Sequence, residues 1–144
     1  MAARTRTAMK VTPALVFAML SAAALAAPPA LTPCPDKPNC VSTEASGKAQ
    51  MAPIPFAGTV AEAQDALRRA IAAQARSTIT REEPGFIAAE FRSRVFGFVD
   101  AAEFVIDADA RVIRFRSGAR SGHYDFGVNR ERIDALHAAL SPAH

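Results

Sequence analysis

The most unusual stretch of the chain is residues 116–130, which read RSGARSGHYDFGVNR. It contains three glycines, three arginines, the chain's only Tyr, and a His close to an Asp. The last six of these residues lead into a predicted helix start, where free backbone N–H groups attract anions. With Arg120 and Arg130 close in sequence, the segment could hold a phosphate or a carboxylate. In the alternative interpretation, Asn129 caps the helix and an arginine pairs with Asp125 or Asp100, which locks the sheet to that helix.

A hydrolytic triad of Ser121, His123 and Asp125 is a tempting interpretation of the same segment. In an extended chain these side chains would share one side at a spacing of about 7 Å. A working triad needs contacts near roughly 3 Å between groups that come from separate elements. We therefore assign no catalytic residue, and catalysis by His123 and Asp125 is the least favoured hypothesis. The candidate ligand-binding residues are Arg94, Arg116, Arg120, His123, Asp125, Asn129 and Arg130.

The segment Val95–Val99 (VFGFV) is apolar where a polar turn would be expected. One interpretation is a bulged continuation of two strands, buried beneath the N-terminal arm. In the other, Phe96 and Phe98 form an exposed tip that contacts lipid or a partner protein. No stripe of lysines accompanies the segment, so strong binding to an anionic membrane surface is not implied.

The two cysteines, Cys34 and Cys40, are most simply a disulfide in an oxidising compartment. Their spacing is wider than the Cys-x-x-Cys of redox-active pairs, and no His or second Cys pair is spaced to complete a zinc site. Residues 107–110 (DADA) lack the remaining ligands of a calcium loop and predict a hairpin turn. We expect neither a metal nor another cofactor.

The N-terminus has the features of a signal peptide. Arg4, Arg6 and Lys10 precede an uncharged, mostly apolar run that ends in Ala24-Leu25-Ala26. Cleavage after Ala26 is expected, which predicts a periplasmic or secreted protein; retention as an anchor is the alternative. The leader holds three of the 17 Lys and Arg, so 14 remain against 14 Asp and Glu. A mature chain without net charge gives little support to nucleic-acid binding.

The pattern predicts a leader (1–26), an extended Pro-rich arm (27–55) and an α+β domain (56–144). The arm offers at most a short edge strand at residues 53–56. A capping box at Thr59–Glu62 begins the first helix, which is expected to end near Arg76. A second helix is expected over Arg130–Leu140, with Asn129 as N-cap, Val128 and Ile133 as a hydrophobic staple, and Pro142 as its stop.

Between the helices, hydrophobic and charged residues alternate along the chain. This pattern predicts an antiparallel sheet of about four strands, with one apolar and one charged face. The expected strands are Ser77–Glu83, Phe86–Val95, Asp100–Ile106 and Arg111–Ser117. Two amphipathic helices should cover the apolar face. The charged face is interpreted either as cross-strand ion pairs in solvent or as a polar groove for a ligand.

Several motifs resemble the domain-of-unknown-function 1499 family. They are SRVFGFVD (residues 93–100), Glu103-Phe104, the spaced pattern RxGxxDxGxNR (120–130) and CPxxPNCVS (34–42). Ala101 stands where the resemblance leads us to expect a second Asp, which argues against a role for paired carboxylates there. The resemblance implies no established activity.

These observations favour a small binding or accessory module of the cell envelope, with an anionic or amphiphilic ligand. A structural protein that docks a partner through Phe96–Phe98 is the alternative. The sequence indicates neither the ligand nor the oligomeric state.

Overall fold

The computed structural model describes residues 27–141, so the predicted leader and the helix stop at Pro142 lie outside the described residues. The elements follow the order β1 (Cys40–Ser42), a 3-10 turn η1 (Gly47–Ala49), β2 (Ile54–Pro55), α1 (Val60–Ala73), β3 (Ser77–Glu83), β4 (Phe86–Arg92), β5 (Val99–Asp107), β6 (Val112–Ala119) and α2 (Val128–Leu140). No helix within this range is long and apolar enough to cross a membrane.

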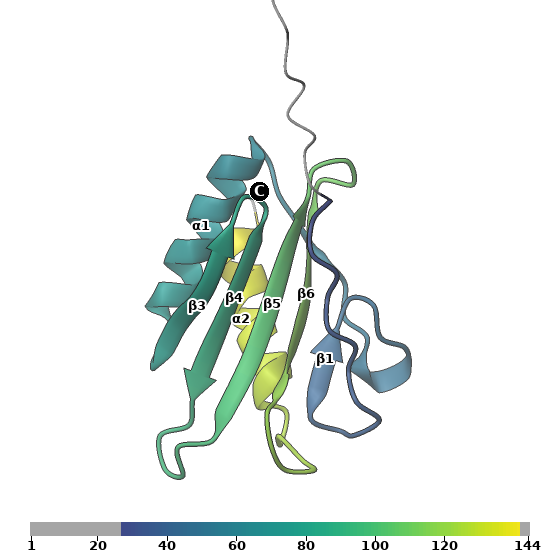
Figure 1. Ribbon diagram of the computed structural model, residues 1–144, viewed down its shortest axis with the longest axis vertical. Coiled ribbons are helices and arrows are strands. Elements are labelled where there is room, and N and C mark those ends of the chain that lie inside the picture. Colours follow the sequence, from purple (N-terminus) through teal and green to yellow (C-terminus); the bar gives the residue numbers. More distant parts are fainter. Residues whose placement is uncertain (1–26, 142–144) are drawn as a thin grey trace, which may run out of the picture.

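The strands form one antiparallel sheet in the order β1-β6-β5-β4-β3, and β2 pairs separately with β6 (Figure 1). The β3–β4 and β5–β6 hairpins have the predicted turns, and the Asp107 side chain accepts bonds from the backbone N–H groups of Asp109 and Ala110. The prediction of about four strands was too low, because the sheet has six. The two additional strands come from the arm. β2 lies within the short edge strand expected at residues 53–56, whereas β1 has three residues, too few to show alternation.

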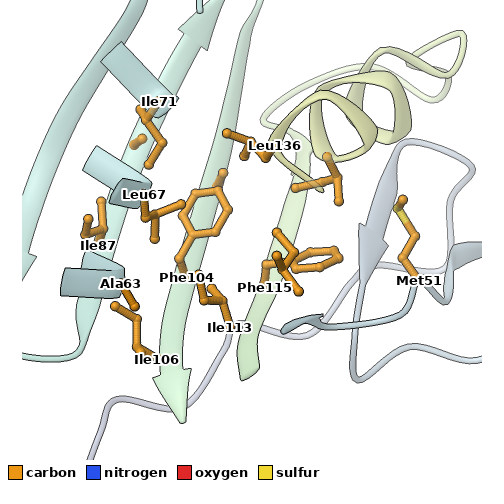
Figure 2. Close-up of a cluster of buried hydrophobic side chains, with 14 of the residues drawn as sticks. Met51, Ala63, Leu67, Ile71, Ile87, Phe104, Ile106, Ile113, Phe115 and Leu136 are labelled. Atoms are coloured by element: carbon orange, nitrogen blue, oxygen red, sulfur yellow. The ribbon is translucent and has the colours of Figure 1, made fainter. Parts of the chain in front are cut away.

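Both helices pack on one face of the sheet, which confirms the predicted layering (Figures 1 and 2). Thr59 and Glu62 form the expected capping box, and α1 buries Ala63, Leu67 and Ile71. These side chains meet the inward-facing residues of β4, β5 and β6, which include Ile87, Ala89, Phe91, Ala102, Phe104, Ile106, Ile113 and Phe115. The period-two pattern therefore identified the core face correctly in three successive strands.

The N-terminal arm crosses the opposite face of the sheet (Figure 1). Leu31 is buried there against Phe86 and Val105. Thr32 bonds Glu103 twice, through its backbone N–H at 2.7 Å and its hydroxyl at 2.8 Å. The Cys34–Cys40 disulfide is present, as predicted. It closes residues 34–40 into a ring, which we call the disulfide ring and which ends at the first residue of β1. The arm thus covers part of the charged face.

Candidate functional site

The start of α2 differs from the prediction. The helix begins at Val128, its N-cap is Gly127, and Asn129 lies inside the first turn. Gly127 has φ +83°, a left-handed conformation that glycine adopts without strain. Val128 is the first helical residue rather than the residue before the cap, and it is 44% exposed, so the predicted staple was wrong as well. Asn129 is not the cap because the helix begins two residues earlier than predicted, directly after Gly127.

The Asp125 carboxylate occupies the place at this helix start that an external anion would take. Its oxygens accept the backbone N–H groups of Gly127 at 3.0 Å and Asn129 at 3.2 Å. The side-chain amide of Asn129 also donates to Asp125, at 2.9 Å. An internal carboxylate satisfies these donors and complements the helix dipole. The geometry therefore gives Asp125 a structural role.

Asn129 belongs to a buried polar network that joins the helix to the sheet. Its side-chain oxygen accepts hydrogen bonds from the Ser117 hydroxyl at 2.7 Å and from the Arg132 guanidinium at 2.7 Å. Arg132 also pairs with Asp100 at 2.8 Å and lies over the Phe91 ring. The expectation that an arginine locks sheet to helix through Asp125 or Asp100 is confirmed for Asp100. The arginine is Arg132, which sequence reasoning had not singled out.

His123 and Arg130 lie apart from each other. His123 is on the exposed loop before α2, where its ring meets Tyr124 edge-on at 4.6 Å between centroids. Arg130 donates to the backbone carbonyl of Lys48 in η1. The hydrogen bonds of the Asp125 side chain go to the helix start and to Asn129, so the geometry does not assemble a Ser121–His123–Asp125 triad.

A cationic cleft lies between the disulfide ring and the end of β6, and we call it the arm cleft. Its volume is about 590 Å³, and its lining includes Lys37, Asn39, Arg116 and Arg120 together with Ser121 and Gly122. The two arginines come from the predicted site set. Lys37 and Asn39 were missed, although both stand inside the motif between the cysteines.

Gly118 allows the disulfide ring to lie close against β6. A Cβ built on Gly118 would approach the Cys40 Sγ to 2.9 Å. Asn39 is then held by two bonds: its carbonyl accepts the Ala119 N–H at 2.9 Å, and its side-chain amide donates to the Gly122 carbonyl at 2.8 Å. The ring, the strand end and the following loop together position one wall of the arm cleft.

Two polar atoms of the arm cleft residues are buried without a hydrogen-bond partner among residues 27–141. They are the side-chain oxygen of Asn39 and Nε of Arg116. The first is an acceptor and the second is a donor. Buried polar atoms are usually paired, so these two are unusual. Both are shielded from solvent, which places them behind the surface of the arm cleft, and Nε of Arg114 is a further unpaired atom outside it. Arg120 is partly engaged, because its guanidinium pairs with Glu90 at 2.5 Å.

The apolar segment after β4 forms an exposed loop, so the expectation that the arm buries it was wrong. β4 ends at Arg92, and the loop closes through a bond from the Ser93 N–H to the Phe98 carbonyl at 2.8 Å. Phe96 is 76% exposed and Phe98 is 58% exposed. The arm runs over the sheet rather than past its end, which leaves these rings uncovered.

Arg94 lines a second, mainly apolar groove of about 370 Å³ beside this loop. Ser121 and Gly122 border both the groove and the arm cleft. The structure thus brings Arg116 and Arg120 together, places Arg94 in the adjoining groove, and places Arg130 in another pocket, which shares Lys37 with the arm cleft. Within residues 27–141, no three His, Cys, Asp or Glu side chains are grouped to hold a metal ion.

Comparison with known proteins gives one family. A search of curated proteins and a search of solved structures find no match. The model of a family described as "Protein of unknown function (DUF1499)" matches residues 30–140, which include the arm, the cleft and both helices. The chain therefore belongs to the DUF1499 family.

Proposed function

We propose that this protein is a binding module and that its ligand is a small anion that also carries a hydroxyl or amino donor. The cationic lining of the arm cleft, with Lys37, Arg116 and Arg120, carries the proposal. Two unpaired atoms behind the surface of the cleft define what the ligand must offer. After a small movement of the Arg116 and Asn39 side chains toward the cleft, Nε of Arg116 would donate to an anionic oxygen, and the Asn39 side-chain oxygen would accept from an O–H or N–H group. A ligand with both groups would satisfy both atoms at once.

The orientation of the Asn39 amide supports this assignment. Its nitrogen donates to the Gly122 carbonyl at 2.8 Å, so a flipped amide would place two acceptor oxygens against each other. The free atom is therefore the oxygen, which cannot bind an anion. The requirement for a donor in the ligand follows from this geometry.

The charge of the arm cleft favours an anion. Lys37, Arg116 and Arg120 line it without an acidic residue in the lining, and Glu90 reaches only Arg120. Fork-shaped guanidinium groups favour carboxylate and phosphate. If the predicted leader is removed on export, this binding activity would serve the cell envelope.

Calorimetry with three probes tests the proposal. We expect glycerol 3-phosphate, which has an anion and hydroxyl donors, to bind more tightly than inorganic phosphate, and glycerol to bind least. Arg116→Gln should weaken glycerol 3-phosphate binding by about tenfold or more, since a charged hydrogen bond contributes about 1.5–3 kcal/mol. Asn39→Asp, of nearly the same shape, should also weaken it by placing a carboxylate beside the anion.

Arg69→Gln is the matched control, because Arg69 is an exposed arginine of α1 far from the arm cleft. It should bind all three probes like the unmodified protein. Equal affinity of the unmodified protein, Arg116→Gln and Arg69→Gln for glycerol 3-phosphate would refute the assignment of the site.

A further inference from the structure

The exposed large hydrophobic side chains of residues 27–141 all lie at one end of the molecule. Two loops there, residues 93–98 and 120–127, extend beyond the ends of the strands, at the lower end of Figure 1. We call them, with the first residue of α2, the aromatic tip. Its exposed apolar residues are Val95, Phe96, Phe98, Tyr124, Phe126 and Val128.

The rings are grouped in pairs on each loop. Phe96 and Phe98 have centroids 5.7 Å apart, and Tyr124 and Phe126 have centroids 6.3 Å apart. Phe126 is 91% exposed, and its backbone φ of +55° is one that a bulky residue rarely adopts. This backbone conformation costs free energy and buries nothing in the monomer, which points to a use of the ring outside the monomer.

The outward charges of the aromatic tip are positive. Asp125 of the tip points to the start of α2, and Asp100, just beyond the tip in β5, points to Arg132. Arg92 and Arg94 are exposed, and among residues 27–141 neither has an acidic partner within ion-pair distance. Residues 27–144 as a whole hold 14 basic and 14 acidic residues, so the positive charge here is a local feature of the aromatic tip.

From these observations we infer that the aromatic tip docks on the surface of a lipid bilayer that contains anionic lipid. Aromatic rings on protruding loops match the interfacial region, where Tyr and other amphipathic rings are favoured. The flanking arginines complement lipid phosphates, each contributing a modest attraction. The apolar rings supply most of the affinity, so a lysine stripe is not required. This inference does not depend on a ligand in the arm cleft.

The chain has no Trp, so a single introduced Trp reports the environment of one position. Phe126→Trp places the probe on the aromatic tip. Phe56→Trp is the matched control, because Phe56 follows β2 at the opposite end of the sheet, beside Arg111. Both variants are made in the full chain, so any effect of the leader is common to both.

The probes are measured with vesicles of phosphatidylcholine alone and of phosphatidylcholine mixed with phosphatidylglycerol. We expect a blue shift and quenching by brominated lipid for Phe126→Trp and neither for Phe56→Trp. In the Phe126→Trp background, Phe96→Ser should lower the partition coefficient by about tenfold, since a buried Phe contributes on that order. Arg94→Gln should lower it about fivefold on the anionic vesicles only, whereas Arg69→Gln should not change it.

Three results would overturn the inference. One is the absence of a shift for Phe126→Trp with either vesicle. Another is an equal shift at positions 126 and 56. The third is a doubling of the solution mass that Phe96→Ser abolishes, because this would show that the aromatic tip binds a second copy of the chain.

Discussion

The two faces of the sheet are covered in different ways. Two helices cover one face with continuous apolar side chains, and Phe104, Leu67, Ile71 and Leu136 are fully buried there. An irregular arm covers the other, where Leu31 contributes the main apolar contact and Thr32 bonds Glu103. A helix satisfies its own backbone and can exclude water along its length, whereas an arm must bond to the strands beneath it. The difference explains why one face forms the core and the other retains a polar cleft.

The largest effect is expected on the helix face. Phe104→Ala should lower the free energy of unfolding by about 3–5 kcal/mol, because it removes a fully buried ring from a close-packed layer. Urea denaturation followed by circular dichroism measures this loss. A loss below about 1 kcal/mol would mean that this layer is not the stabilising core.

Leu31→Ala makes the corresponding truncation on the arm face. We expect a smaller loss, about 2 kcal/mol, because the arm can settle onto Phe86 and Val105 after the side chain is shortened. The same urea experiment applies, with binding of glycerol 3-phosphate as a second readout. The contrast between the faces fails if Leu31→Ala costs as much as Phe104→Ala.

Gly118→Ala tests the close contact between the arm and β6. The new methyl group would lie 2.9 Å from the Cys40 Sγ, so the disulfide ring must move, at a cost of about 1–2 kcal/mol. In a Cys34→Ser/Cys40→Ser background the cost should shrink, because the ring is no longer closed. A double-mutant cycle measures this coupling, and additive effects would show that the methyl group acts elsewhere.

The smallest effect on stability is expected at the N-terminal capping box of α1. Bonds from the Thr59 backbone and hydroxyl lower the pKa of Glu62 below its ordinary 4.5. A lowered folded-state pKa gives stability that is present above pH 4.5 and is lost as the pH falls through the folded value. Glu62→Gln should therefore reduce the acid dependence of the melting temperature below that pH. If Glu62→Gln leaves the pH dependence of the melting temperature unchanged, Glu62 does not contribute to the loss of stability in acid.

The sequence predicted the helix face well because periodicity reports burial directly. Alternation in β4, β5 and β6 identified the inward residues, and the capping box located the start of α1 within one residue. β3 was predicted with the bounds it has. Each of these features depends on residues that are close in sequence.

The arm face was predicted less well because its contacts are distant in sequence. Thr32 meets Glu103 across 71 positions, and Asn39 meets Gly122 across 83. No local pattern signals such pairs, so Lys37 and Asn39 were not recognised as neighbours of Arg116 and Arg120. The buried loop expected at Val95–Val99 failed for a related reason, since whether an apolar loop is covered depends on the path of the arm.

The short strands of the arm also have a consequence for solubility. β1 and β2 pair with β6 at different points, so this side of the sheet offers little unpaired backbone to another molecule. The opposite side ends in β3, whose register shifts between Ile79 and Arg81 and whose last residues are Arg81, Glu82 and Glu83. Bulges and charges at a border strand discourage intermolecular strand pairing. The molecule is therefore protected at both borders of its sheet against growth into fibrils.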